Sequence, residues 1–574
     1  MTGGDRIAEV LVAHGVRFLF TLCGGHISPI LVGAKQRNIR VVDVRDEASA
    51  VFAADAVARL SGTPGVAALT AGPGLTNAIT AVKNAQLAQS PVVLLGGATA
   101  TMLKGRGALQ DIDQTALLRP HVKFLATVRR GRDLAPAVAA AFHTAQAGVP
   151  GPAFVECPVD LLYPEATVRD WYGLAAAKQP RNMGQRLSRW YLRRHVERLF
   201  AGADRATPAL APPVPGAPSA SALRRTAELL AQSERPVLLL GSQVATPAYV
   251  GALRRSVEAL GCPVFVSGMA RGLMGQEHPL LLRHRRGAAL READLVLLAG
   301  VPCDFRLDYG RSINPNARVV AANLSAAEAR KNRRPTVTAA GDPARFIVAL
   351  APLLGGSARW QPWLDTLRAR DDERQAEIAR LAGTSTEYLN PLALCRAIDT
   401  VLPDDSVIVA DGGDFVGTAA YIVSPRGPLS WLDPGPFGTL GVGAGFALGA
   451  KLCRPRAEVW LLYGDGSAAF SLAEFDTFVR HSLPVIAVVG NDGAWSQIAR
   501  GQVELLRDDV GTVLRRTDYE RVAEGYGATG LKITRAEQMA PVLREAQAIA
   551  RSGSPVLVNA LIGKSEFRAG SIAI

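Results

Sequence analysis

Two short polar motifs in the C-terminal third of the chain each follow an apolar run. They are Gly464-Asp465-Gly466 and Asn491-Asp492. Asp465 follows EVWLLYG, and Asn491 follows VIAVVG. The carboxyl ends of parallel strands lie at one edge of a sheet, where ligands bind, so these two side chains are expected to meet there. A carboxylate, a carboxamide and the carbonyl of Gly493 are oxygen ligands of the kind that Mg²⁺ takes together with diphosphate oxygens. The spacing therefore predicts a Mg²⁺ site.

The residues around the carboxylate indicate a phosphate site. Gly464 and Gly466 flank Asp465, and Gly466 with Ser467 opens a helix expected over SLAEFDTFVRH. The first amides of a helix point away from it and favour an anion. A tight turn and an unrelated Asn-Asp turn would give the same letters, and each motif alone is weak. The two motifs at this separation favour a site for a metal ion and a diphosphate.

A third stretch, TLCGGHISPI, stands where an N-terminal strand gives way to a helix. Two glycines at such a junction let the backbone approach a ligand. His26 follows them, and an imidazole takes up and releases protons near neutral pH. By position alone, a structural turn residue explains His26 as well as a catalytic one does.

The elements that would position these groups repeat one pattern. Apolar runs alternate with stretches of helical periodicity in three blocks, which predicts parallel sheets covered by helices on both faces. The expected fold class is α/β, with three doubly wound parallel-sheet domains. The expected segments are residues 1–165 for the first domain, 166–218 for an amphipathic helix and a Pro/Ala-rich linker, 219–355 for the central domain, 356–385 for a second linker, and 386–574 for the C-terminal domain with its tail.

Composition limits the class of protein. The 574 residues are too many for one core. No apolar run reaches the ~20 residues that cross a bilayer, so no transmembrane span is expected. The start lacks the order of a signal peptide and the six cysteines are scattered, which predicts a reducing cytoplasm. The net charge of +13 comes largely from dispersed arginines, which favours anionic small molecules over nucleic acid.

One basic stretch, LSRWYLRRHVERLF at residues 187–200, is also amphipathic. Packing against its own subunit or a neighbouring one is the favoured interpretation. A lid or a helix on a membrane surface is the alternative.

The motif at Asp465 and Asn491 resembles the signature of thiamine-diphosphate enzymes, which usually have a second asparagine where this chain has Asp492. The segment DPGPFGTLGVGAG resembles the one against which the cofactor's aminopyrimidine lies. The resemblance implies that the Gly438 carbonyl and the Leu440 amide bond the ring, and that the Leu440 side chain supports the bent cofactor. It also implies that a loop gives amides to the diphosphate, namely Gly412, Gly413, Asp414 and Phe415.

The N-terminal block carries the other half of this resemblance. VRDEASAVFAADA resembles the family stretch that holds the catalytic glutamate, here Glu47, whereas a solvated glutamate at a helix start is the alternative. A carboxyl group bonded to the pyrimidine favours the tautomer that removes the thiazolium proton. TAGPGLTNAI resembles the turn that closes on the pyrimidine, with Gly72, Pro73 and a supporting Asn77. The family joins these halves across subunits, which implies a homodimer or homotetramer.

Other stretches are similar to one branch, the acetolactate synthase-like 2-hydroxyacyl-CoA lyases. They include GGHISP, GALQDIDQ and the closing FRAGSIAI. The resemblance implies cleavage of a 2-hydroxyacyl-CoA to formyl-CoA and an aldehyde one carbon shorter, or the reverse condensation. It makes His26 the group that handles the hydroxyl proton and Gln110 a group that orients the same oxygens. Gln114 is expected near the substrate.

Further substrate contacts are expected beyond the cofactor motif. Trp495, Gln497 and Ile498 could line an acyl pocket, with a core role for Trp495 equally open. Arg286 and Arg306 lie in segments that resemble nucleotide-contacting ones and are candidates for phosphate. Relatives that bind FAD or ADP in the central domain often have an acidic residue where AANLS stands here, so neither nucleotide is favoured there.

Other functions share parts of this pattern. An acetolactate synthase, another 2-oxo acid decarboxylase or carboligase, or an acyloin lyase similar to benzaldehyde lyase would use the same scaffold. A non-catalytic homologue is disfavoured because Glu47, Leu440, Asp465 and Asn491 occur together. A tandem NAD- or FAD-dependent oxidoreductase lacks a convincing G-x-G-x-x-G after its first strand.

Overall fold

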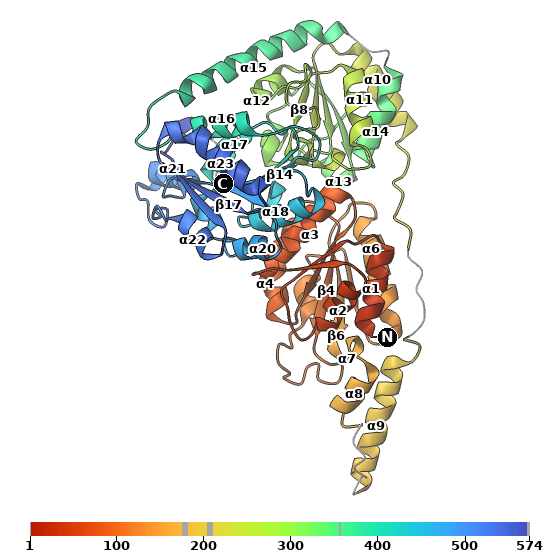
Figure 1. The fold of residues 1–574 in the computed structure, drawn as a ribbon. Helices are drawn as coiled ribbons and strands as arrows, with labels where there is room; N and C mark the ends of the chain where they lie inside the picture. The colour runs from red at the N-terminus through yellow and green to blue at the C-terminus, as the bar shows by residue number, and fades with distance from the viewer. Residues whose placement is uncertain (1, 175–181, 204–209, 355–357, 571–574) are drawn as a thin grey trace. The chain divides into compact units, whose positions relative to one another are not determined.

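The computed structural model describes residues 2–174, 182–203, 210–354 and 358–570, and Figure 1 shows its fold. The chain forms two compact units, Met1–Val214 and Pro215–Ile574. The first unit holds one sheet and the second holds two, and every strand pair in the three sheets is parallel. The α/β class with three parallel-sheet domains is therefore confirmed.

The sheet of the first unit has the strand order β2-β1-β3-β4-β6-β5. β3 and β4 are buried along their whole length, as expected for strands covered on both faces. The strands are β1 (Phe18–Thr21), β2 (Arg40–Asp43), β3 (Gly65–Leu69), β4 (Val92–Ala98), β5 (Phe124–Thr127) and β6 (Ala153–Pro158). The helices are α1 (Gly3–Ala13), α2 (Ser28–Gln36), α3 (Glu47–Ser61), α4 (Pro73–Leu87), α5 (Gln114–Leu118), α6 (Leu134–Gln146), α7 (Val159–Leu162), α8 (Glu165–Trp171) and α9 (Met183–Phe200).

The first sheet of the second unit has the order β11-β10-β9-β7-β8 and forms the central domain. Its strands are β7 (Pro236–Leu240), β8 (Val264–Val266), β9 (Leu295–Ala299), β10 (Arg318–Asn323) and β11 (Val337–Ala340). The helices of this part are α10 (Ala220–Gln232), α11 (Val250–Leu260), α12 (Arg286–Glu292), α13 (Ala326–Ala329), α14 (Pro343–Leu350) and the long α15 (Gln361–Ala382). The expected second linker is therefore mostly one helix, α15.

The second sheet of this unit has the order β13-β12-β14-β15-β17-β16. Its strands are β12 (Ser406–Ala410), β13 (Trp431–Leu432), β14 (Glu458–Gly464), β15 (Val485–Asn491), β16 (Thr529–Ile533) and β17 (Val556–Leu561). Its helices are α16 (Pro391–Val401), α17 (Asp414–Ile422), α18 (Gly443–Cys453), α19 (Asp465–Ala468), α20 (Glu474–Arg480), α21 (Ser496–Leu506), α22 (Tyr519–Gly525) and α23 (Met539–Arg551).

The N- and C-terminal sheets share one topology, because both read 2-1-3-4-6-5 when their strands are numbered from the first. In such an order the second strand lies on one side of the first strand, and the third strand lies on its other side. The first and third strands then flank a switch point, which is where ligands of open α/β sheets bind. β1 and β3 flank it in the first unit, and β12 and β14 flank it in the second.

One predicted helix is wrong. The helix expected to continue from Gly466 and Ser467 through SLAEFDTFVRH is two helices, the single turn α19 and the separate α20. Turns separate them at Phe470 and Ser471, whose amides bond carbonyls three residues back, and Ser471 Oγ is 2.7 Å from the hydroxyl of Tyr463. That bond ties the break to β14.

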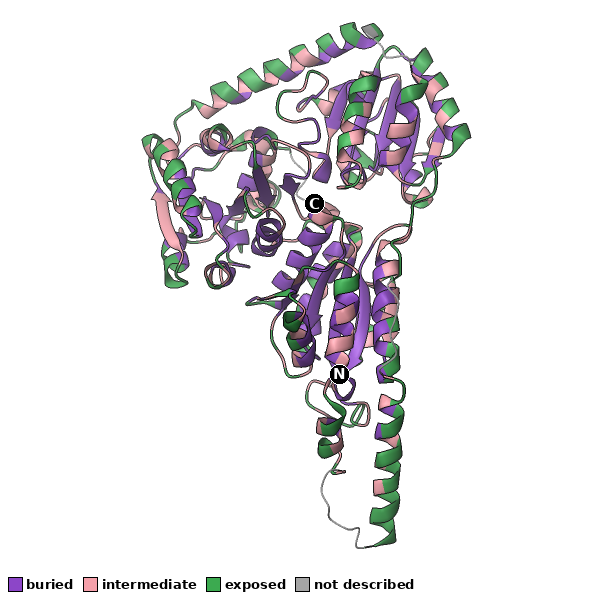
Figure 2. Cartoon of the chain, turned by 45° about the vertical axis from the view of Figure 1, so that its right-hand side comes forward, coloured by how far each residue is buried: buried purple, intermediate pink, exposed green. Residues whose placement is uncertain are grey.

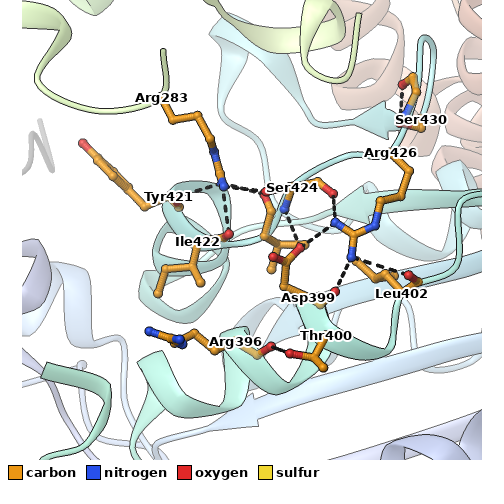
Figure 3. Close-up of polar contacts among 12 residues, drawn as sticks. Arg283, Arg396, Asp399, Thr400, Leu402, Tyr421, Ile422, Ser424, Arg426 and Ser430 are labelled. Carbon is orange, nitrogen blue, oxygen red and sulfur yellow. Dashed lines mark hydrogen bonds and ion pairs between the residues drawn. The ribbon is translucent and has the colours of Figure 1, made fainter. Parts of the chain in front are cut away.

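Arg283 joins the central and C-terminal domains of the second unit, and Arg426 makes contacts within the C-terminal domain (Figure 3). Arg283 donates to Ser424 Oγ and to the carbonyls of Tyr421 and Ile422, the last residues of α17. Arg426 donates to Asp399 Oδ1 at 3.0 Å near the end of α16. The last carbonyls of a helix lack intrahelical partners, so both guanidinium groups satisfy such carbonyls, and Arg283 of the central domain also holds that domain to the C-terminal one.

Candidate active site

Glu47 follows β2 in the first unit, and its side chain is fixed by neighbours from α4. It is the first residue of α3, because the side chain of Asp46 accepts the Ala48 amide at 2.7 Å and caps the helix. The Glu47 side chain is buried at 5% exposure, and its Oε2 accepts a hydrogen bond from Asn77 Nδ2 at 3.2 Å. The sequence-predicted pair of carboxyl group and amide is thus brought together by α3 and α4.

His26 lies in the turn between β1 and α2, beside the end of β4. The turn is closed by the Ile27 amide, which donates to the Gly24 carbonyl at 3.1 Å. A Cβ on Gly97 would lie 2.6 Å from the Cβ of His26, so only glycine lets β4 approach the histidine this closely. His26 is half-buried, and this burial lowers its pKa below the ordinary 6.5. The imidazole is therefore neutral at pH 7 and able to accept a proton.

The turn at Gly72 brings the two predicted glutamines to the same edge. Gly72 has φ +66, and a Cβ there would lie 2.8 Å from the carbonyl of Gln110. Gln110 itself has φ +64, an uncommon conformation for a residue with a side chain. Gln114 is 2% exposed, and its Oε1 accepts the Gly72 amide at 3.1 Å. Pro73 begins α4 directly after this turn.

Gln114 is held from behind by a residue that the sequence motifs did not single out. Its Nε2 donates to Oε1 of Glu156 at 3.0 Å and to the Gly97 carbonyl at 3.1 Å. Glu156 is fully buried in β6 and is also paired with Lys104 at 2.7 Å. These contacts make Gln114 a support for the turn at Gly72. A charged residue inside the apolar strand AFVECP was the signal in the sequence.

Asp465 and Asn491 lie at the ends of the neighbouring strands β14 and β15, as the spacing predicted. Asp465 is buried, and its two oxygens accept the amides of Gly466 and Gly493, each at 2.8 Å. Burial and the charge of nearby Asp492 raise the pKa of Asp465 to about 7. Two carboxylates this close favour a cation between or beside them.

Asn491 presents an oxygen that protein groups leave unused. Its side chain is fully buried, and its Nδ2 donates to the Thr517 carbonyl at 3.0 Å and to Asn559 Oδ1 at 3.2 Å. Its Oδ1 has no hydrogen-bond partner within the described part of the chain. A buried amide oxygen without a partner is costly. Together with the Asp465 carboxylate, this oxygen fits a hard divalent cation.

The third expected ligand has a partner of its own. The Gly493 carbonyl accepts the Leu514 amide at 2.8 Å, and φ at Gly493 is +69. A carbonyl oxygen has two lone pairs, so one remains for a cation. No group of three or more His, Cys, Asp or Glu residues that could hold a metal occurs in the described residues. A cation here would thus depend on amide and main-chain oxygens beside Asp465.

The loop after β12 forms a cradle against the Gly464 turn. Ser467 Oγ donates to the Gly412 carbonyl at 3.0 Å, and the Gly464 amide also bonds that carbonyl at 3.1 Å. Gly413 has φ +106, which only glycine adopts readily. A Cβ on Gly412 would lie 2.2 Å from Cδ2 of Leu440, so the predicted supporting leucine packs directly on the loop. The glycines leave the backbone of this loop open to close approach by a phosphate group.

Asp411 ties this loop to the segment that contains Gly438 and Leu440. Its buried carboxylate accepts the amides of Gly441 at 3.0 Å and Gly443 at 2.7 Å. Burial raises the pKa of Asp411 to about 7 despite these two bonds. Gly438 itself has φ +64. The predicted pyrimidine segment and the predicted diphosphate loop are therefore adjacent in space.

The other two loop residues have different surroundings. Phe415 is buried, and its ring lies where a Cβ on Gly490 would be, at 2.3 Å, so this side chain belongs to the core. The Asp414 carboxylate accepts Arg500 Nη2 at 2.9 Å, and Arg568 Nε lies 3.7 Å from it. The C-terminal tail thus returns to the start of α17, while residues 571–574, which close the motif FRAGSIAI, lie outside the described residues.

The predicted acyl-pocket residues follow β15 and do not all face one space. The Trp495 ring covers Gly466, where a Cβ would lie 2.4 Å from it. Gln497 is half-buried near the start of α21, and Ile498 is 47% exposed. Trp495 thus contacts the cofactor motif itself.

The predicted phosphate residues of the central domain are adjacent but differ in their surroundings. Arg286 Nη2 donates to the carbonyl of Arg306 at 2.9 Å, whereas the Arg306 guanidinium pairs with Asp304 at 2.6 Å. Arg286 lines a cavity of about 360 Å³ between the central and C-terminal domains. The cavity walls include four arginines and a histidine and no acidic side chain, namely Arg271, Arg283, His284, Arg285 and Arg286. This composition favours an anion.

The positions of these groups agree with what sequence comparison finds. Three family descriptions match the chain: "Thiamine pyrophosphate enzyme, N-terminal TPP binding domain" over residues 1–117, "central domain" over 223–350, and "C-terminal TPP binding domain" over 411–560. The first covers Glu47, Asn77 and Gly72, and the last covers Asp465 and Asn491.

Several relatives match this chain over nearly its whole length. The 2-hydroxyacyl-CoA lyase 2 of Homo sapiens is 52% identical over 583 residues, which cover all of this chain and 92% of that protein. The 2-hydroxyacyl-CoA lyase 2 of Danio rerio is 51% identical over all of this chain and 93% of its own length. A probable acetolactate synthase of Mycobacterium bovis is 35% identical over 98% of this chain and 96% of its own. This chain belongs to the thiamine pyrophosphate enzyme family.

Proposed function

We propose that this chain cleaves a 2-hydroxyacyl-CoA into formyl-CoA and an aldehyde one carbon shorter, with thiamine diphosphate and Mg²⁺ as cofactors. The observation that carries the proposal is the grouping of His26, Gly72 and Gln110 at the edge of the sheet where Glu47 is held. Relatives named 2-hydroxyacyl-CoA lyase 2, about half identical over the whole chain, support the substrate class.

Bound thiamine diphosphate supplies a nucleophilic carbon and a place for the electrons released when a carbon–carbon bond breaks. With the cofactor bound, Glu47 would exchange a proton with its pyrimidine ring, and burial and the bond from Asn77 hold the Glu47 carboxyl group in place for this role. Asp465 and Asn491 would hold Mg²⁺ through their side-chain oxygens, and Gly493 would add its carbonyl. Ser467 and the glycines at 412, 413 and 464 shape the cradle that binds the diphosphate.

His26 accepts the proton of the 2-hydroxyl group as the bond between C1 and C2 breaks. A neutral imidazole is needed for this step, and the burial that lowers the pKa of His26 provides it at pH 7. Gln110, from the segment between β4 and α5, lies against the turn at Gly72 and orients the hydroxyl and thioester oxygens. Gln114 positions that turn through its bonds to Gly72 and Glu156.

A complete site needs both compact units, and we assign them to two copies of the chain. Glu47 and His26 belong to the first unit, whereas Asp465 and Asn491 belong to the second. Large apolar side chains are exposed beside each half, with Leu109 at 83% and Phe470 at 62%. Covering such side chains with a second copy is the usual outcome for a protein of this kind. We therefore propose a homodimer or homotetramer.

The arginine-lined cavity of the second unit is the proposed site for phosphate groups of the CoA moiety. Burial lowers the pKa of Arg286, and the described residues that line the cavity with it include no acidic side chain, so a bound anion would stabilise the guanidinium. Acyl chains then extend toward Trp495 and Ile498, which line the way out of the cofactor motif.

The compartment proposed is the cytoplasm, because all six cysteines are free thiols in the structure. No helix among the described residues is both long enough and apolar enough to cross a bilayer.

A parallel assay tests the proposed function. The purified protein with thiamine diphosphate and Mg²⁺ is offered a 2-hydroxyacyl-CoA, pyruvate and benzoin, and aldehydes, acetolactate and CoA thioesters are measured. We expect aldehyde and formyl-CoA in equal amounts from the first substrate. Turnover of pyruvate without aldehyde release from the acyl-CoA would instead identify a 2-oxo acid carboligase.

A further inference from the structure

The N-terminal half of α9 exposes apolar side chains along one face of the helix. Met183, Leu187, Trp190 and Tyr191, here named the α9 stripe, are 71%, 61%, 57% and 56% exposed. Their spacing of i, i+4, i+7 and i+8 puts them on one side of the helix. Figure 2 shows most of α9 as exposed. Scattered apolar residues need no explanation, but an aligned stripe with two aromatic rings does.

The C-terminal half of α9 anchors the helix to its own unit, so the helix that carries the stripe has a fixed attachment. Val196 and Leu199 are buried, and Leu199 belongs to the apolar core of the first sheet. His195 Nε2 lies 3.1 Å from Thr101 Oγ1. Figure 1 shows α9 running from this anchor away from the sheet and beside α8. The expectation that this basic helix packs on its own subunit therefore holds only for its last turns.

The charges beside the stripe are mostly positive. α9 contains five arginines and one glutamate, Glu197, which pairs with Arg193 at 3.0 Å. The Arg194 guanidinium lies 5.4 Å from the centre of the Trp190 ring. On neighbouring α8, Trp171 is 50% exposed and its ring packs at a tilt of 58° against Tyr163, with ring centres 4.9 Å apart. Aromatic rings with arginines around an apolar face are typical of helices that lie in a bilayer interface.

We propose that α9 binds this protein to the surface of a bilayer that contains anionic lipids, with the α9 stripe in the acyl boundary and the arginines at the phosphates. Pairing of two α9 stripes is disfavoured, because a twofold contact would place two strongly basic helices side by side. Nucleic acid would use the arginines but leave the apolar stripe in water. A bilayer satisfies both features, and α9 lies on it without crossing it.

Vesicle flotation of the full-length protein tests this proposal. The vesicles contain either phosphatidylcholine alone or phosphatidylcholine with phosphatidylglycerol. We expect binding to the anionic vesicles that falls with salt. Replacing Leu187, Trp190 and Tyr191 together by Ala should weaken binding at least about tenfold. Each Arg→Gln change at positions 186, 189 and 193 should weaken it about fivefold.

Matched controls separate the stripe from general effects. Leu505→Ala with Leu506→Ala removes exposed apolar side chains of α21, at 74% and 73% exposure, and Arg224→Gln with Arg225→Gln removes charge from α10. Both control variants should bind vesicles like the parent. Light scattering checks that the stripe variant keeps its oligomeric state, and a thermal unfolding curve checks that it keeps its Tm. Absence of vesicle binding, or equal binding by the stripe variant, overturns the proposal. A stripe variant that dissociates instead shows that a second copy covers α9.

Discussion

Asn559 fixes the orientation of Asn491: its Oδ1 accepts a hydrogen bond from Asn491 Nδ2 at 3.2 Å. Asn559 is itself held by Glu520, whose Oε2 accepts the Asn559 Nδ2 at 2.6 Å. A flipped Asn491 amide would place an oxygen against the Asn559 oxygen. The pair thus leaves Asn491 Oδ1 as the side-chain atom without a hydrogen-bond partner among the described residues.

Replacing Asn559 by Ala should weaken Mg²⁺ binding about 10- to 100-fold, because the Asn491 amide loses the group that orients it. The measurement is the Mg²⁺ concentration needed for thiamine diphosphate to raise Tm, which does not depend on turnover. Asn84→Ala is the control, since Asn84 is also fully buried but bonds Asp55 in the first unit. It should lower Tm without changing the Mg²⁺ requirement. An unchanged requirement in Asn559→Ala would contradict the positioning role.

Replacing Glu47 by Gln should lower kcat at least about a hundredfold, because the amide cannot exchange the proton. The shape is kept, so Asn77 retains an acceptor and Tm should remain close to that of the parent. Asp46→Asn is the neighbouring control: Asp46 is exposed, and asparagine also caps helices. Its kcat should stay near the parent value. Equal losses in both variants would point to damage at the start of α3.

Mixing two inactive variants tests whether one site uses two copies. Glu47→Gln and Asn491→Ala are expected to be inactive alone. If each site combines Glu47 of one copy with Asn491 of another, a mixed dimer holds one intact site, and an equal mixture assembled at random should recover about a quarter of the parent activity. The measurement is aldehyde release after co-refolding or co-expression. No recovery, with mixed dimers shown by mass, would place both groups of a site in one copy.

The pH dependence of kcat/KM should report the protonation of His26. The burial that lowers its pKa below 6.5 leaves it neutral at pH 7. Below that pKa the imidazolium cannot accept the hydroxyl proton, so kcat/KM should fall about tenfold per pH unit. His26→Gln should lose this acidic limb together with most activity.

His14→Gln is the control for this pH profile. His14 lies in the same unit and stacks on Phe142 with ring centres 4.5 Å apart. Burial lowers its pKa, as it does that of His26. Its replacement should leave the acidic limb in place. An acidic limb that survives in His26→Gln would assign the proton transfer to another group.

Most of the strand pattern could be predicted from local sequence. Runs such as VVLLGG and VIAVVG are buried on both faces and therefore almost purely apolar, which a sequence reveals directly. The sequence did not indicate two strands that lack a long apolar run. β13 has only two residues, and β16 is half-buried over most of its length. The break between α19 and α20 was also missed, because it depends on a contact from Ser471 to Tyr463.

The residues of the candidate site also fall into two groups, those that sequence motifs reveal and those that they do not. Asp465, Asn491 and the Gly412 loop are recognisable because each follows a strand within a few residues, so chain connectivity alone brings them to one edge. Their supports are not recognisable as motifs. Asn559, Glu156 and Asp411 are single polar residues in or beside apolar strands, and their partners are 30 to 68 residues away in the chain.

The sequence by itself determined the alternating α/β elements, the residues at the strand ends and the family resemblance, because these depend on local spacing and hydrophobic period. Only the tertiary structure decided that the side-chain oxygen of Asn491 is unpartnered among the described residues, that Gln114 supports the turn at Gly72, and that α9 leaves an apolar stripe exposed. Hydrogen-bond partners and burial are set by residues distant in the chain, so no local pattern contains them.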